Sequence, residues 1–331
     1  MRYRSVGTTG VKISEIGFGC GNNAVLMVHA DYDSQLKTVQ RALDLGINFF
    51  DTAFLYGLGK SEQNLGRILG ELGADPVIST KIRLEPRSLG DLKATTIEAV
   101  EAGLGRLDMR AVEFVQLHTP VAFERSGAKR FCLTPSEVLG PGGVLEGFKA
   151  MRDLGKVRHF GFTGLGEPQA LLELVDSGEF HGFQAYYNLL NPSSGHRVGR
   201  SFGALNYGEI IERAAAHGMG AFAIRILAAG ALTSDPGAGG GSSPEALSPG
   251  SDYASDLRRA EKLRLALGID GERLTQAAIR FGLMNPAVSS VVVGFSNPAQ
   301  VEEAVACSGA PPLRDDEIRR IAKLWETDFA D

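Results

Sequence analysis

The sequence predicts an α/β protein whose strands close into a (β/α)8 barrel behind an N-terminal β-hairpin. Eight short apolar runs alternate along the chain with longer amphipathic stretches. Neighbouring parallel strands need a connection of helix length between them, so this alternation indicates a parallel sheet. A chain of 331 residues has the length of one large barrel, and we expect residues 1–331 to form a single domain.

The hairpin is expected at the start of the chain, where the segment from Arg2 to Ser14 turns at the triplet "TTG". The apolar runs predict the eight barrel strands, over residues 15–19, 47–52, 76–81, 112–118, 158–163, 182–187, 221–226 and 289–294. The amphipathic stretches predict helices over residues 33–45, 60–72, 88–106, 143–155, 166–177, 206–217, 254–284 in two segments, 297–306 and 314–328.

Two long connections interrupt the alternation, residues 119–143 after the fourth strand and residues 234–253 after the seventh. In a parallel barrel both leave the carboxyl ends of strands, where such barrels carry their active sites, so we interpret them as loops over a site. The competing architecture is an open, doubly wound sheet with a GxGxxG turn after its first strand. The stretch "GFGCGN" at residues 17–22 lacks that spacing and is not followed by a helix start, which favours the barrel.

Composition and charge exclude several classes of function. The 34 basic and 39 acidic residues are interspersed and give a net charge of −5, so nucleic acid is not an expected partner. The N-terminus lacks the apolar core of a signal peptide, and no run approaches the roughly 18 apolar residues of a membrane span, so we expect a cytoplasmic protein. Three distant cysteines and six histidines without metal-binding spacing predict no disulfide framework and no metal site. Nothing in the sequence indicates an oligomeric state.

Four ionisable residues stand at the ends of three consecutive predicted strands. Asp51 ends the second strand and Tyr56 follows it in "DTAFLYG", while Lys81 ends the third strand and His118 the fourth. Parallel barrel strands present their carboxyl ends at one mouth, so these side chains are expected to meet. An ammonium lowers the pKa of a neighbouring phenol from about 10, and a carboxylate holds that ammonium in place. Tyr56 is then expected to exchange a proton near neutral pH, while His118 donates a hydrogen bond to a carbonyl oxygen.

Each of these residues also has an ordinary structural role. Asp51 can cap a helix, and Lys81 can reach solvent from a strand end. His118 can be a partly buried histidine with its hydrogen bonds satisfied, and Tyr56 can line a pocket. Their occurrence together at successive strand ends favours a common site instead. Such a site protonates an oxygen while another group attacks the adjacent carbon, and it needs no serine or cysteine nucleophile.

The motifs around these residues resemble those of the aldo-keto reductase superfamily. The resemblance covers nearly the whole chain, in "SEIGFG", "DTAFLYGLGKSEQNLGRIL", "ISTKI", "LEGFKAMRDLGKVRHFGFTG", "FQAYYNLLN", "GALT" and "VVVGFSNPAQVEEAV". It implies a (β/α)8 barrel and reversible hydride transfer between the nicotinamide of NADP(H) and a carbonyl or alcohol carbon. By this resemblance Tyr56 is the general acid, Lys81 and Asp51 tune it, and His118 orients the carbonyl.

The resemblance also implies cofactor contacts, and some positions depart from the family pattern. Thr163 and Gly164 stand where the family often has Ser and Asn. Ile224 replaces the aromatic residue that usually stacks on the nicotinamide. Gln184 matches the contact to the nicotinamide carboxamide. The full set of implied cofactor contacts is Gly19, Cys20, Asp51, Thr163, Gly164, Gln184, Ile224, Arg225, Leu227, Gly294, Ser296, Gln300 and Glu303.

Arg225 replaces a small polar residue of the family. Its planar guanidinium suits a cofactor phosphate or a substrate carboxylate, and the structural alternative is a salt bridge to a loop carboxylate. At the adenosine end, Glu303 matches a family contact to the adenine. The family usually has a basic residue against the 2′-phosphate, but residues 294–304 contain no lysine or arginine. The expected cofactor is NADP(H) by resemblance, with NAD(H) as the alternative.

The expected substrate is a small aldehyde, ketone or sugar, and Phe54, Leu55, Phe123 and Phe131 are candidate walls of its pocket. Two alternatives stay open. One is an NAD(P)-dependent sugar dehydrogenase that works in the oxidative direction at the same site. The other is a regulatory subunit that uses a bound nucleotide as a redox sensor.

Overall fold

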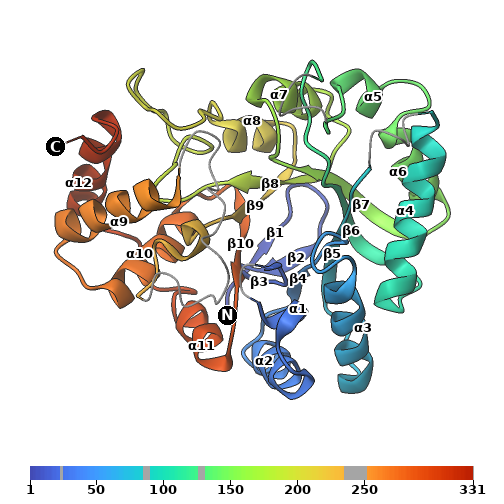
Figure 1. The fold of residues 1–331 in the computed structure, drawn as a ribbon, viewed down its shortest axis with the longest axis horizontal. Helices are drawn as coiled ribbons and strands as arrows, with labels where there is room; N and C mark the ends of the chain where they lie inside the picture. Colours follow the sequence, from blue (N-terminus) through green and yellow to red (C-terminus); the bar gives the residue numbers. More distant parts are fainter. Residues whose placement is uncertain (23–24, 85–89, 126–130, 235–251, 331) are drawn as a thin grey trace.

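In the computed structural model, eight parallel strands close into a barrel surrounded by helices (Figure 1). The structure describes residues 1–22, 25–84, 90–125, 131–234 and 252–330. The last strand, β10, pairs with the first, β3, and closes the cylinder. The predicted barrel is confirmed, and every strand end lies within two residues of its prediction. The barrel strands are β3 (Ile16–Gly19), β4 (Phe49–Asp51), β5 (Val77–Ile82), β6 (Val112–Leu117), β7 (Val157–Thr163), β8 (Gly182–Tyr186), β9 (Gly220–Ile224) and β10 (Val288–Gly294).

The predicted hairpin is confirmed and closes the amino-terminal end of the barrel. Its strands, β1 (Tyr3–Ser5) and β2 (Lys12–Ser14), pair antiparallel, and the turn between them is fixed by a 2.9 Å hydrogen bond from the Val6 N–H to the Val11 carbonyl. Inward-facing apolar side chains of the hairpin and of four barrel strands form one buried cluster there, composed of Val6, Ile13, Phe49, Phe114, Phe222 and Val292. The carboxyl ends of the strands are therefore the end at which a ligand can enter.

Amphipathic helices cover the outside of the barrel and bury its outward-facing side chains. On α6, for example, the ring of Phe148 stacks on Phe160 of β7 with centroids 5.6 Å apart. The predicted segment 254–284 is two helices, as expected, whereas α1 and α5 were not predicted. The α-helices are α1 (Leu26–His29), α2 (Tyr32–Asp44), α3 (Lys60–Leu72), α4 (Leu92–Leu107), α5 (Pro135–Leu139), α6 (Val144–Asp153), α7 (Pro168–Asp176), α8 (Ile210–Ala216), α9 (Tyr253–Leu267), α10 (Gly271–Met284), α11 (Pro298–Ala306) and α12 (Asp315–Glu326).

Three long connections leave the carboxyl ends of strands. The one after β6 was predicted as irregular over residues 119–143, but it contains α5, which begins at a capping box of Thr134 and Glu137. In the one after β9, residues 235–251 lie outside the described part of the chain. The third, residues 187–209 after β8, has no helix or strand and was not predicted as a long loop. Trp325 of α12 fastens it by donating its indole N–H to the Leu189 carbonyl over 2.8 Å.

Among the helices that the structure describes, none has the length and apolar character needed to cross a membrane.

Candidate active site

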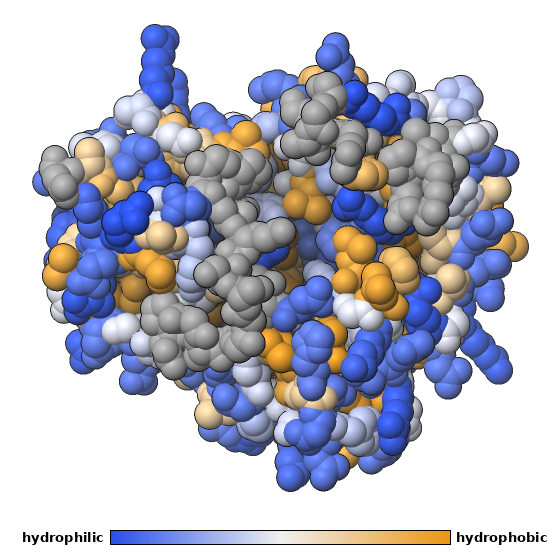
Figure 2. Space-filling model, viewed as in Figure 1, coloured by the Kyte–Doolittle hydropathy of each residue, from blue (hydrophilic) through white to orange (hydrophobic). Residues whose placement is uncertain are grey.

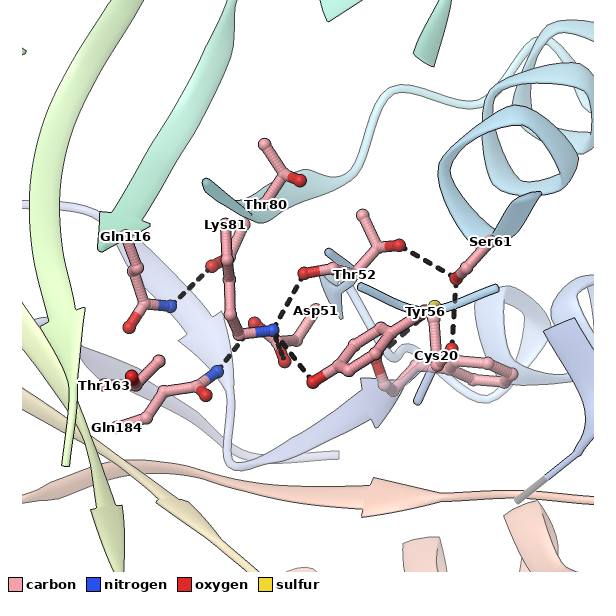
Figure 3. A network of polar contacts seen from close by, with 12 residues as sticks. Cys20, Asp51, Thr52, Tyr56, Ser61, Thr80, Lys81, Gln116, Thr163 and Gln184 are labelled. Carbon is pink, nitrogen blue, oxygen red and sulfur yellow. Dashed lines mark hydrogen bonds and ion pairs between the residues drawn. The ribbon is translucent and has the colours of Figure 1, made fainter. Parts of the chain in front are cut away.

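Three of the four residues predicted at the strand ends form one hydrogen-bonded group (Figure 3). The Lys81 ammonium donates to Asp51 Oδ2 over 2.6 Å, to the Thr52 carbonyl over 2.8 Å and to the Tyr56 hydroxyl over 3.2 Å. An ammonium has three N–H donors, so these contacts use all of them. The Tyr56 oxygen therefore accepts a hydrogen bond from Lys81, and its own proton is left to donate elsewhere.

Strand register brings these side chains together. Asp51 is the last residue of β4, and Lys81 lies near the end of the neighbouring strand β5. Tyr56 belongs to the turn between β4 and α3, where its backbone N–H donates to the Ala53 carbonyl over 3.1 Å. The next residue, Gly57, has a φ of +64°, and a Cβ atom there would lie 2.5 Å from a methyl group of Val28 on α1. Only glycine fits this position without strain, so it fixes how the Tyr56 turn meets α1.

The second oxygen of Asp51 is also held. Gln184, on β8 across the barrel, donates its side-chain N–H to Asp51 Oδ1 over 2.7 Å. Both carboxylate oxygens are thus fixed in a residue that is only 2% exposed. Gln184 was predicted to contact a cofactor, and its hydrogen bond to Asp51 was not predicted. Gln116 was not predicted as a site residue either, although strand alternation puts it on the same face as His118; it donates to the Ser79 hydroxyl over 2.8 Å.

His118 completes the group, and the structure brings together all four predicted residues. It follows β6, and its ring lies edge-on to the Tyr56 ring, with centroids 6.0 Å apart. Its backbone is anchored by a 2.8 Å hydrogen bond from its N–H to the Ile82 carbonyl. The buried Nδ1 atom of its ring has no hydrogen-bond partner among the residues described. One ring nitrogen of a neutral histidine donates and the other accepts, so the imidazole has capacity for a ligand.

Electrostatics at the mouth differ from the sequence-based expectation. The pKa of Tyr56 is raised, because burial disfavours the phenolate more strongly than Lys81 favours it. The expectation that Lys81 brings Tyr56 to titrate near neutral pH is therefore wrong. Burial works to lower the pKa of Lys81, but the charge of Asp51 and the hydrogen bonds to Asp51 and Tyr56 outweigh it and raise that pKa. Burial, with the charges of Lys81, Arg83 and Arg225, holds the pKa of His118 well below its usual range, so its ring is neutral at pH 7.

The expected cofactor residues lie at the same end of the barrel. Gly19 ends β3, and the next residue, Cys20, has both backbone groups occupied: its N–H donates to the Asp51 carbonyl over 2.9 Å, and its carbonyl accepts from the Ser61 hydroxyl over 3.0 Å. Burial raises the pKa of the Cys20 thiol, which makes it unreactive. At the end of β7, a Cβ atom on Gly164 would lie 2.7 Å from the Gln184 carbonyl, so this backbone leaves no room for the family's Asn.

The remaining expected contacts lie at or after the ends of β7, β9 and β10. Thr163 ends β7, and its hydroxyl donates to the Leu117 carbonyl over 3.2 Å. At the end of β10, the backbone N–H of Ser296 donates to the side chain of Gln300 over 2.8 Å. On α11, the Glu303 atom Oε1 is buried and has no partner in the described ranges. The others are strand-end or turn residues, with Ile224 last in β9, Arg225 and Leu227 between β9 and a short 3-10 helix (Ala228–Gly230), and Gly294 last in β10.

Apolar side chains flank the mouth, whose face is hollowed near its centre (Figure 2). Phe123 and Phe131 are 45% and 47% exposed, which suits residues that could cover a ligand. Phe54, by contrast, packs its ring 4.9 Å beneath the guanidinium carbon of Arg106 on α4. Ordinary packing therefore accounts for Phe54. Leu55 is half-buried in the same turn.

Known proteins share the sequence pattern and the fold of this chain. The model of the "Aldo/keto reductase family" matches residues 15–326. An L-galactose dehydrogenase of Arabidopsis thaliana is 27% identical over 313 residues, which covers 92% of this chain and 88% of that protein. A probable voltage-gated potassium channel subunit beta of the same plant is 29% identical over 340 residues, covering 95% and 93%. The solved holo form of aldo-keto reductase AKR11C1 from Bacillus halodurans matches the fold with a TM-score of 0.73 at 24% identity, covering 99% of this chain and 97% of that one.

Proposed function

The chain belongs to the aldo/keto reductase family and is an oxidoreductase; from this premise we propose that it interconverts a carbonyl compound and an alcohol by hydride transfer, with Tyr56 exchanging the proton. The observation that carries the proposal is the Lys81 ammonium, which touches both Asp51 and the Tyr56 hydroxyl in a buried mouth. We further propose that residues 1–331 form one domain.

In the proposed reduction, hydride adds to the carbonyl carbon while the electron pair of the C=O bond takes the proton of Tyr56. The phenolate that remains is stabilised by Lys81, whose own charge is held by Asp51, and solvent later returns the proton. A raised pKa keeps Tyr56 protonated until this step, so essentially every molecule carries its acid at neutral pH. Neutral His118 donates a hydrogen bond to the same carbonyl oxygen and orients it.

A nicotinamide dinucleotide bound at this mouth would supply the hydride. The residues suit such a ligand at its adenine end, because the Glu303 oxygen, which is buried and without a partner among the described residues, is an acceptor for an amino group. Gln184 retains its side-chain oxygen for the carboxamide, since only its N–H is given to Asp51. Ile224, which is partly buried, provides an aliphatic contact for the ring. We propose NADP(H), following the family, with NAD(H) as the alternative that the uncharged and acidic residues 294–304 favour.

The Tyr56→Phe variant tests the assigned acid. It removes the hydroxyl and keeps the ring, so carbonyl reduction should fall by about 10²- to 10⁴-fold while the dissociation constant for NADPH, measured by fluorescence titration, changes less than about twofold. The matched control is Tyr3→Phe in the hairpin at the opposite end of the barrel, which should retain full turnover. Unchanged turnover in Tyr56→Phe would show that another group supplies the proton.

The names of similar proteins suggest two alternative functions. The similarity to a protein named L-galactose dehydrogenase makes oxidation of a sugar the second candidate, and initial rates with a sugar panel and oxidised cofactor test it. The similarity to proteins named potassium channel beta subunits makes a nucleotide-binding regulatory role the third. Cofactor binding without turnover over a broad carbonyl panel would favour that role.

A further inference from the structure

Arg225 is a half-buried cation at the mouth of the barrel that no carboxylate neutralises in the described part of the chain. It follows β9 directly, and its side chain makes no hydrogen bond or ion pair with any residue in residues 1–22, 25–84, 90–125, 131–234 or 252–330. An arginine side chain stays charged and carries five donors in a planar fork. Leaving such a group partly desolvated and unpaired is unfavourable, which points to a ligand that completes it.

The backbone holds Arg225 in a conformation that arginine rarely adopts. Its φ is +59°, in the left-handed region, where a side chain other than glycine is strained. Its carbonyl accepts two hydrogen bonds, from the side-chain N–H of Asn188 over 3.0 Å and from the Ala228 N–H over 2.8 Å. Asn188 is itself buried and fixed, because its side-chain oxygen accepts from the N–H groups of Leu190 and Asn191. Strain held by surrounding contacts in this way is typical of functional positions.

The charge of Arg225 acts on the reacting groups of the proposed mechanism. It contributes to lowering the pKa of His118, and it opposes the rise in the pKa of Tyr56. Lys81 also acts on both of these side chains, but its Nζ atom is already paired with Asp51 Oδ2 at 2.6 Å. The pair of Lys81 and Asp51 has no net charge, so it does not compensate the charge of Arg225.

We propose that Arg225 binds an anionic group of the substrate, so that the preferred substrates are small carbonyl compounds with a carboxylate or phosphate close to the carbonyl. These are oxo acids or phosphorylated aldehydes in reduction, and the matching hydroxy acids or alcohols in oxidation. This inference rests on the proposed function for its chemistry. The structural alternative, a salt bridge from Arg225 to a loop carboxylate, is not found among the residues that the structure describes.

A substrate anion fits this position better than a cofactor phosphate. In a nicotinamide dinucleotide a ribose separates the diphosphate from the reacting ring. Arg225 instead acts on both Tyr56 and His118, the two groups that would hold the substrate oxygen. A carboxylate a few bonds from the carbonyl reaches a guanidinium in that place, and it forms two parallel hydrogen bonds with the planar fork.

Matched substrates with and without a charge test the inference. The acids are glyoxylate, pyruvate, 4-oxobutanoate and 4-formylbenzoate, each compared with its methyl ester, and glyceraldehyde 3-phosphate is compared with glyceraldehyde. At least one charged member should have a kcat/KM about tenfold to a hundredfold above its neutral partner in the wild type, as expected for hydrogen bonds to a charged group. Arg225→Met should remove this advantage and leave the neutral partners within about threefold. Arg225→Lys should retain part of it, since it keeps the charge and loses the fork.

The control is Arg110→Met, which removes the same charge from an exposed arginine just before β6, at the other end of the barrel. It should behave as wild type, and thermal unfolding should show that Arg225→Met is folded. The inference is overturned if no charged substrate is preferred, or if Arg225→Met lowers kcat/KM for charged and neutral partners equally and weakens NADPH binding. The latter result would assign Arg225 to a cofactor phosphate.

Direct binding separates this inference from the proposed function. Calorimetric titration of the protein with each acid should show binding that Arg225→Met weakens at least about tenfold and Arg110→Met leaves unchanged. If the wild type turned over no carbonyl compound but bound an acid through Arg225, the proposed function would fail and the anion site would stand. If no acid bound in a manner dependent on Arg225, the anion site would fail whatever the turnover.

Discussion

Replacing Lys81 by methionine tests the ion pair on which the geometry of the site depends. The Lys81 Nζ and Asp51 Oδ2 atoms are 2.6 Å apart, and the two side chains are 0% and 3% exposed. Methionine approximates the volume of lysine without its charge. Lys81→Met therefore leaves Asp51 buried, and the hydrogen bond from Gln184 is the side-chain contact that remains to it among the described residues. Breaking a buried pair by removing one partner costs about 3–5 kcal/mol, because the other charge loses its compensation. We expect urea unfolding at pH 7 and 25 °C to give a free energy of unfolding lower by about this amount.

A double-mutant cycle separates the pair from the packing of its members. Asp51→Asn alone leaves the ammonium unpaired, whereas Asp51→Asn combined with Lys81→Met removes both charges. The double variant should therefore be more stable than the sum of the single losses predicts, by about 2 kcal/mol or more. Strict additivity, or a loss below about 1 kcal/mol in Lys81→Met, would refute the view that a tightly coupled buried pair holds this site together.

Three further measurements follow from the same site. Burial raises the pKa of Tyr56 and lowers that of His118. The kcat/KM for carbonyl reduction should therefore be constant from about pH 7 to 9 and fall only above about pH 10, where Tyr56 loses its proton. An inflection near pH 6.5 would contradict a neutral His118 imidazole. Residues 294–304 contain no lysine or arginine that could bind the 2′-phosphate, and a hydrogen bond to a charged group contributes about 1.5–3 kcal/mol. The specificity constants for NADPH and NADH should therefore differ by less than about tenfold. A hundredfold preference for NADPH would show that a residue elsewhere in the chain binds the phosphate. Gly57→Ala should destabilise the fold by about 1–3 kcal/mol and reduce turnover, because its Cβ would strike Val28, and adding Val28→Ala should restore part of both losses, as followed by thermal unfolding and initial rates.

The sequence was sufficient to locate the reacting groups because topology alone brings them together. Asp51 and Lys81 end neighbouring parallel strands, and any closed parallel barrel gathers such residues at one mouth. Contacts across the barrel could not be read in this way. The hydrogen bond from Gln184 to Asp51 joins residues 133 positions apart, and it depends on barrel diameter and strand tilt rather than on any local pattern. The connection over residues 187–209 was missed because the contact that holds it comes from Trp325, far along the chain.

The direction of the Tyr56 pKa was also beyond sequence reasoning, since it is a balance between two opposing effects. The sequence identifies the ammonium that lowers this pKa, but only the structure shows a burial large enough to raise it overall. The outcome makes the two directions of the reaction unequal. Reduction uses the phenol, which is the whole population at pH 7, whereas oxidation needs the phenolate, which is less than about one molecule in a thousand when the pKa exceeds 10. The rate of alcohol oxidation should therefore rise about tenfold per pH unit through neutrality while reduction stays level.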